Sequence, residues 1–90
     1  MLELHKSAQF KADYKLMKRR GYDMQLLKDV VAILQKTASL PPQNKDHQLV
    51  GNLKDFRECH IQPDWLLMYY VTGGGLYLSR TGTHSDMFDE

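Results

Sequence analysis

Residues 65–83 decide the fold, and they read WLLMYYVTGGGLYLSRTGT. The first eight residues are almost all apolar or aromatic, which is typical of a strand and too apolar for an edge strand with two exposed faces. The glycines at 73–75 are expected to form a tight turn, because glycine readily adopts the positive φ angles of hairpin turns. Residues 76–83 then form the returning strand. The stretch therefore predicts an antiparallel hairpin whose first strand lies away from the sheet edge.

Upstream of this hairpin, the sequence predicts a short strand followed by two helices. Residues 2–5 alternate apolar and polar side chains, as a strand does. Ser7 can cap a first helix that stops at Gly21, and Asp23 can begin a second that fades around residues 36–38. The side chains expected to be buried are Phe10, Tyr14 and Met17 in the first helix, and Leu26, Leu27, Val30, Val31, Ile33 and Leu34 in the second.

Residues 39–52 are expected to form a loop, because Pro41 and Pro42 forbid a continuing helix and the following residues are polar. Residues 53–61 predict another strand, with a turn at Pro63. The element order is then β-α-α-β-β-β. This order predicts a single α+β domain over residues 1–90, with a mostly antiparallel sheet packed against two N-terminal helices.

Composition narrows the possible partners and location. The chain has 90 residues and a formal net charge of +1, but residues 1–36 hold eight Lys or Arg against four Asp or Glu, and residues 37–90 hold four against seven. The basic half suits an anionic partner. The single Cys59 excludes an internal disulfide and fits a reducing compartment. No leader and no apolar run of membrane-spanning length is visible, so we expect a cytoplasmic protein without a membrane partner.

Three histidines, His47, His60 and His84, lie in short polar clusters. Strand alternation predicts that Glu58 and His60 share the open face of the sheet, while Cys59 and Ile61 face the helices. Arg80 and His84 are spaced i and i+4 along the last strand and its extension, which also predicts a common face. The expected cluster is Glu58, His60, Arg80 and His84, with Lys45 and His47 closing over it from the loop.

Such a set can cleave RNA without a metal ion. The ribose 2′-OH needs a base, the departing 5′-oxygen needs an acid, and the phosphate needs positive charge as the transition state forms. Histidines and carboxylates can act as base and acid, and an arginine such as Arg80 can hold phosphate oxygens bidentately. Phe88 is a candidate for stacking on an unpaired base.

Simpler readings compete with this one. Surface histidines are often incidental, as we expect for His5, and a basic helix face is usually just solvated. Glu58 could pair with Arg80 across the strands, and Trp65 and Tyr69 are expected in the core. A zinc site would need three or four converging ligands, yet Cys59 and His60 are adjacent on a strand and point opposite ways. We therefore expect no metal, no cofactor and no cysteine nucleophile.

Three segments together resemble the YafQ branch of the RelE/ParE toxin superfamily. They are residues 45–51 (KDHQLVG), 56–65 (FRECHIQPDW) and 80–88 (RTGTHSDMF). The resemblance implies a RelE-like fold and a type II toxin that is an mRNA endoribonuclease acting on ribosome-bound message. It also implies neutralisation by a cognate antitoxin, typically a ribbon-helix-helix protein.

The resemblance also implies residue roles. Arg80 matches the phosphate-stabilising arginine, and Phe88 the base-stacking aromatic. Lys45 lies in the first motif, and its place on the loop predicts a contact with the substrate. His84 is the first choice for the general acid, and the base stays open among the other candidates. The residues that match catalytic acid or base positions are His47, His60, Asp64 and His84, with Glu58 at a position that is acidic in relatives. The residues expected to contact ribosomal RNA are Lys11, Lys15, Lys18, Arg19 and Arg20.

Two further functions stay open on the sequence. A ParE-like toxin would share the fold but bind and inhibit a protein target such as DNA gyrase, without chemistry. A catalytically silent partner-binding protein would arrest growth regardless of its histidines. The histidines of the open face favour the enzyme, because a binding module has no chemical reason to hold them.

Overall fold

The computed structural model describes residues 1–88, and its two long helices begin where the sequence places their caps. Helix α1 spans Ala8–Arg19 and helix α2 spans Met24–Gln35. The Ser7 hydroxyl accepts a hydrogen bond from the backbone N–H of Phe10, and the Asp23 carboxylate accepts one from Gln25. Such caps satisfy N–H groups that have no partner within a helix. Between the helices, Gly21 adopts φ 88°, the left-handed conformation that ends a helix cheaply only at glycine.

The five strands form one sheet in the order β1-β5-β4-β3-β2. Their bounds are Glu3–Lys6 (β1), His47–Gln48 (β2), Arg57–Gln62 (β3), Trp65–Thr72 (β4) and Gly75–Gly82 (β5). The predicted hairpin of β4 and β5 is confirmed, and β4 is the central strand, as its apolar character requires. All neighbours are antiparallel except β1, which pairs in parallel with residues 75–78 of β5. The α+β fold with a mostly antiparallel sheet is therefore confirmed.

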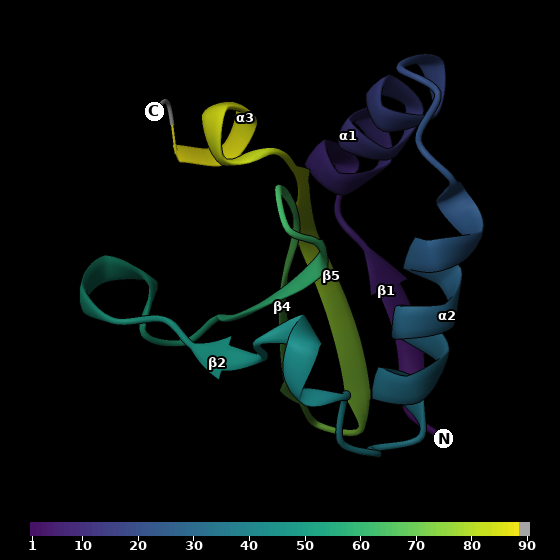
Figure 1. Ribbon diagram of the computed structural model, residues 1–90. Coiled ribbons are helices and arrows are strands. Elements are labelled where there is room, and N and C mark those ends of the chain that lie inside the picture. The colour runs from purple at the N-terminus through teal and green to yellow at the C-terminus, as the bar shows by residue number, and fades with distance from the viewer. Residues whose placement is uncertain (89–90) are drawn as a thin grey trace.

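Helices α1 and α2 lie on one face of the sheet, and the core is between them and the central strands (Figure 1). Trp65 and Tyr69 are buried in this core, as predicted. Cys59 is fully buried beside them, and burial raises the pKa of its thiol to about 12. Because only a thiolate is a good nucleophile, Cys59 is a packing residue. No helix among residues 1–88 is both long and apolar enough to cross a membrane.

Three local predictions were wrong. The segment 39–52 is not a plain loop: it holds the 3₁₀ turns η1 (Pro42–Asn44) and η2 (Gly51–Leu53) and the strand β2 between them. Strand β3 begins at Arg57, later than the expected residue 53. The last strand ends at Gly82, and a third helix, α3, spans His84–Phe88 where we expected the strand to extend. Strand β2 forms because the edge of β3 offers it backbone hydrogen-bond partners.

Candidate active site

The predicted site residues on the sheet lie in two adjacent rows on the face away from the helices. Residues directly opposite one another in antiparallel strands share a face, and successive rows on that face are about 7 Å apart. The first row is formed by the register partners His47, Glu58, Met68 and Arg80. The second row is formed by His60, Leu66 and Gly82. The register thus brings the backbone of Arg80 into the row of Glu58, which is next to the row of His60.

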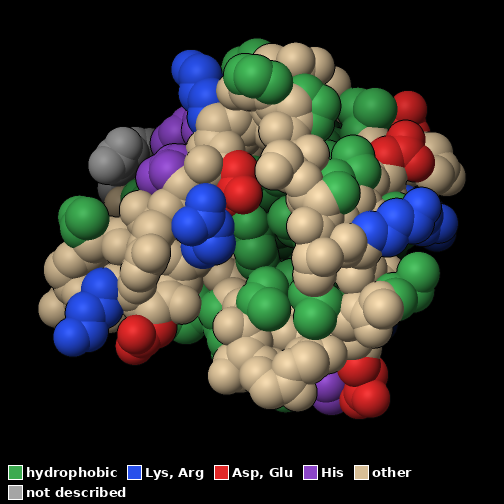
Figure 2. All heavy atoms as spheres, turned by 90° about the horizontal axis from the view of Figure 1, so that it is seen from below, with side chains coloured by type: hydrophobic (Ala, Val, Ile, Leu, Met, Phe, Trp, Pro, Cys, Tyr) green, Lys and Arg blue, Asp and Glu red, His purple; other side chains and the backbone are tan. Residues whose placement is uncertain are grey.

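His60 and His84 form a pair at the end of the second row. Their ring centroids are 5.8 Å apart, and the planes are inclined by 55°. Both side chains are partly exposed, and Figure 2 shows histidine side chains grouped at one side of the surface. The expectation that an extended strand brings His84 to this face was wrong, because the strand ends at Gly82 and His84 begins a helix. His84 reaches His60 from the first turn of α3.

The hydrogen bonds of the two imidazoles define which nitrogen is available. His84 Nδ1 lies 2.5 Å from Asp64 Oδ1, and the same carboxylate oxygen accepts the backbone N–H of His84 at 3.0 Å. His60 Nδ1 lies 3.1 Å from the carbonyl oxygen of Pro63. Since both partners are acceptors, each Nδ1 carries the proton, and each Nε2 is left to act on a substrate. The backbone N–H of His84, with help from its ring, lowers the pKa of Asp64, which is therefore a carboxylate.

His47 lies at the β2 edge of the first row and does not close over the histidine pair. Its Nδ1 contacts the carbonyl oxygen of Lys45 at 2.7 Å, and its Nε2 is 3.8 Å from Glu58 Oε1. Asp46 anchors this segment to the sheet, because it accepts hydrogen bonds from the Tyr69 hydroxyl at 2.6 Å and from Arg57 at 3.3 Å. His47 is thus fixed on the sheet by its neighbours in β2 and β3.

Glu58 and Lys45 occupy contrasting positions. Glu58 is buried, with 6% of its surface exposed, and its Oε2 is the one buried side-chain polar atom within residues 1–88 that has no hydrogen-bond partner. The simpler reading, in which Glu58 pairs with Arg80, was wrong. Lys45 is exposed and lines, with His60, a surface cavity of about 260 Å³. The loop thus brings Lys45 to the same cavity as His60.

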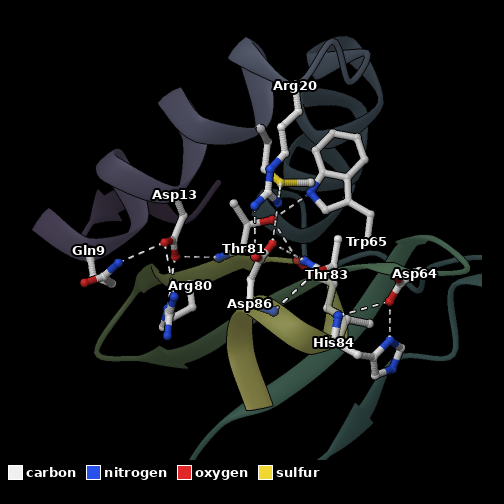
Figure 3. A network of polar contacts seen from close by, with 12 residues as sticks. Gln9, Asp13, Arg20, Asp64, Trp65, Arg80, Thr81, Thr83, His84 and Asp86 are labelled. Atoms are coloured by element: carbon white, nitrogen blue, oxygen red, sulfur yellow. Dashed lines mark hydrogen bonds and ion pairs between the residues drawn. The ribbon is translucent and has the colours of Figure 1, made fainter. Parts of the chain in front are cut away.

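Arg80 pairs with Asp13 of α1, a residue that the sequence pattern does not single out. Strand β1 pairs only with residues 75–78 of β5, so the later part of β5 has no strand on that side. There Arg80 donates to Asp13 through Nε at 3.0 Å and Nη2 at 3.2 Å, and the Thr81 backbone N–H donates to the same carboxylate (Figure 3). Gln9 also donates to this carboxylate. The hydrogen bonds to Asp13 raise the pKa of Arg80, which is a permanent cation. The i, i+4 spacing of Gln9 and Asp13 was the available signal, but it does not identify Arg80.

Helix α3 is held by a second arginine–carboxylate pair. Arg20, at the C-terminal end of α1, donates to Asp86 at 2.6 and 3.1 Å (Figure 3). The hydrogen bond from Arg20 is the main reason that the pKa of Asp86 is held far below the usual carboxyl range. Arg20 is therefore engaged within the protein, and its expected contact with RNA stays a prediction. Phe88 is the last residue of α3 and is partly exposed.

The lowered pKa of Asp86 predicts a pH-dependent loss of stability. A carboxyl group whose pKa is lower in the folded state contributes its full stabilisation above the ordinary value of about 4 and loses it as the pH falls further. We expect the free energy of unfolding to decline more steeply between about pH 4 and pH 2 in the wild type than in Asp86→Asn. Urea unfolding at several pH values would measure both slopes. Parallel slopes would show that Asp86 does not contribute.

The remaining basic residues of α1 are exposed. They are Lys11, Lys15, Lys18 and Arg19, and none of the four forms an ion pair within residues 1–88. In the same part of the chain, no three His, Cys, Asp or Glu side chains are placed to hold a metal ion together.

Comparison with known proteins places this geometry in a family. The family model described as a bacterial toxin of type II toxin–antitoxin systems, YafQ, matches residues 2–89. The mRNA interferase toxin YafQ of Escherichia coli K12 is 40% identical over 87 residues, which cover 96% of this chain and 95% of that protein. A copper-bound mutant toxin from Helicobacter pylori is 42% identical with a TM-score of 0.95, covering 98% of this chain and 100% of that one. YafQ in the E. coli DinJ–YafQ complex is 39% identical with a TM-score of 0.90, covering 98% and 99%. With its RelE-like sheet and its paired histidines, this chain belongs to the YafQ family of type II toxins.

Proposed function

We propose that this toxin is an mRNA interferase that cleaves message on the ribosome by metal-free acid–base catalysis between His60 and His84. The observation that carries the proposal is the histidine pair itself. The two rings are 5.8 Å apart, and each Nδ1 is held by an acceptor so that each Nε2 is available. The name of the E. coli relative, an mRNA interferase, supports the same activity.

The partners of the two histidines divide the roles of base and acid. The Pro63 carbonyl next to His60 is neutral, which suits a neutral imidazole whose Nε2 accepts a proton. The Asp64 carboxylate next to His84 orients that ring, and a carboxylate in this position stabilises an imidazolium. In the proposed reaction, His60 Nε2 takes the proton of the 2′-OH while the 2′-oxygen forms a bond to phosphorus. His84 Nε2 gives its proton to the 5′-oxygen as the bond from phosphorus to that oxygen breaks. The products are a 2′,3′-cyclic phosphate and a 5′-hydroxyl end.

Arg80 supplies positive charge to the phosphate in this scheme. Arginine has five N–H groups, and the two that donate to Asp13 leave three for phosphate oxygens. Preorganised donors of this kind stabilise the charge that develops in the transition state. Lys45 and Phe88 are proposed to hold the substrate on either side, by charge and by base stacking. Glu58 and His47 lie in the row next to the histidine pair, where they are proposed to assist the acid–base step.

We propose that the toxin acts on the ribosome, in the cytoplasm. The basic surface of Lys11, Lys15, Lys18 and Arg19 fits ribosomal RNA, because clustered cations bind phosphates by releasing counterions. A cognate antitoxin, of the ribbon-helix-helix type, is proposed to neutralise the toxin. The solved complex of E. coli YafQ with DinJ supports such a partner. A ParE-like action on gyrase is less well supported, since it would leave the tautomer-fixed histidine pair without a use.

The proposal predicts cuts in translated messages that depend on His84. We would map new 5′-hydroxyl ends of mRNA after brief induction in a bacterium, for the wild type, His84→Ala and His5→Ala. His5 is a matched control, because it is a partly exposed histidine that contacts Glu3 and Tyr77 away from the pair. We expect in-frame cuts for the wild type and His5→Ala, and none for His84→Ala.

The other outcomes contradict specific parts of the proposal. Growth arrest without new ends would indicate a toxin that acts by binding. Equal cleavage by His84→Ala would remove His84 from the chemistry. Cleavage by purified toxin that a chelator abolishes while ribosomes stay intact would contradict a metal-free reaction.

A further inference from the structure

Helix α3 carries His84 but is too short to be stable by itself. It has five residues, and isolated helices shorter than about 12 residues are marginal in water. Its position therefore depends on contacts with the rest of the protein. Figure 1 shows that α3 lies beyond the end of β5 and near α1.

The first turn of α3 is closed by a reciprocal pair of hydrogen bonds. Asp86 Oδ2 accepts the Thr83 backbone N–H at 2.9 Å, and Thr83 Oγ1 accepts the Asp86 backbone N–H at 3.2 Å. This is the arrangement of a capping box. Gly82 allows the close return of the chain, because a Cβ at this position would lie 2.9 Å from the Cβ of Asp86. The carboxylate of Asp86 is thereby held at a defined place, two residues from His84.

Arg20 ties this carboxylate to the core of the protein. Its two Nη atoms donate to the two oxygens of Asp86 at 2.6 and 3.1 Å, which is a bidentate arrangement. Arg20 is the C-cap of α1, and Nη1 also approaches the sulfur of the fully buried Met17 at 3.7 Å. Because Phe10 and Met17 pack α1 into the core, Arg20 extends from the end of a helix that is itself held in place.

We propose that Arg20 is a positioning residue for RNA cleavage: by holding Asp86 it fixes α3 so that the His84 imidazole stays opposite His60. The inference rests on the proposed function above and removes Arg20 from the RNA-contacting surface. It separates Arg20 from its neighbour Arg19, which is exposed on the same turn without an ion pair in the described part of the chain. Loss of Arg20 should slow the chemical step, whereas loss of Arg19 should weaken docking.

The kinetic test is a double-mutant cycle with Arg20→Gln, Asp86→Asn and the double variant, measured by cleavage on ribosomes programmed with a short message. Asparagine keeps a capping oxygen for Thr83 and loses the charge. We expect each single variant to lower the rate at saturating ribosomes by about 10–100-fold with little change in KM, since small misplacements of catalytic groups have effects of this size. The double variant should be no slower than the slower single variant, because both remove one interaction. Arg20→Lys should recover part of the rate, and the matched control Arg19→Gln should raise KM alone.

A structural readout makes the test independent of activity. Imidazole NMR signals of His84 and His60 should shift in Arg20→Gln, while those of His5 should stay in place. A raised KM at an unchanged maximal rate in Arg20→Gln, multiplicative effects in the double variant, or unmoved His84 signals would each overturn the inference. If wild type and His84→Ala cleave equally, the proposed function fails, and the imidazole signals still decide whether Arg20 positions His84.

Discussion

Replacing Arg80 by alanine is expected to lower the cleavage rate at saturating ribosomes by about 10²–10³-fold, the loss seen when one preorganised donor to a developing negative charge is removed. The reason is the geometry of the pair with Asp13. Two N–H groups of the guanidinium are fixed on a buried carboxylate, so the remaining N–H groups point in a constant direction. A fixed donor needs no reorganisation when charge develops on the phosphate. Single-turnover cleavage on programmed ribosomes would measure the rate.

Arg80→Lys separates charge from geometry. Lysine keeps the positive charge but cannot hold Asp13 with two parallel hydrogen bonds. We expect it to recover only part of the lost rate. Unfolding midpoints of both variants must exceed the assay temperature, so that slow cleavage reports on chemistry. A rate for Arg80→Ala within about twofold of the wild type would remove Arg80 from the proposed mechanism.

Replacing Asp13 by alanine is expected to lower the free energy of unfolding by about 2–4 kcal/mol. The variant loses charge-assisted hydrogen bonds, and the buried donors that bonded to the carboxylate are left without an acceptor. Asp13 is 6% exposed and accepts four hydrogen bonds, from the side chains of Arg80 and Gln9 and from the backbone of Thr81. After the substitution, the buried Thr81 N–H has no acceptor. Equilibrium unfolding in urea would measure the loss, and the midpoint of thermal unfolding should fall by more than about 10 °C.

Asp29→Ala is a matched control for this prediction. Asp29 accepts from Gln25 in α2 with the same i, i+4 spacing that relates Gln9 to Asp13, but it is exposed. Its removal should change stability by no more than about 0.5 kcal/mol, as for most surface substitutions. Similar losses for the two variants would mean that the buried contacts with β5 add nothing, which would contradict the expected role of Asp13.

Helix α1 therefore has two distinct surfaces. Its outer face carries Lys11, Lys15, Lys18 and Arg19, which the sequence pattern identifies directly. Asp13 on its buried face and Arg20 at its C-terminal end each make a bidentate pair with a residue at the end of β5 or in α3. A helix with the proposed docking function on its outer face thus also supports the proposed catalytic residues.

Local chemistry, which can be read directly from the sequence, determines much of this protein. The caps Ser7 and Asp23 satisfy backbone N–H groups within three residues, so the helix starts are local events. The apolar run of β4 and the glycines after it specify a central hairpin, because burial and turn geometry act over a few residues. The three histidines and Arg80 could be identified as candidates because the chemistry of a side chain does not depend on the fold.

Only the tertiary structure decided how these residues meet. The two-residue strand β2 and the five-residue helix α3 have no stability of their own, and they form because β3 and α1 supply their partners. Asp13 and Arg80 are 67 residues apart, and Arg20 and Asp86 are 66 apart, so no local pattern could pair them. The bulge between β4 and β5 puts Arg80 in register with Met68, and the Arg80 side chain still pairs with Asp13 of α1 rather than with Glu58. Contacts between distant segments depend on the whole packed chain. The sequence therefore identified the candidate site residues but did not predict how they are arranged.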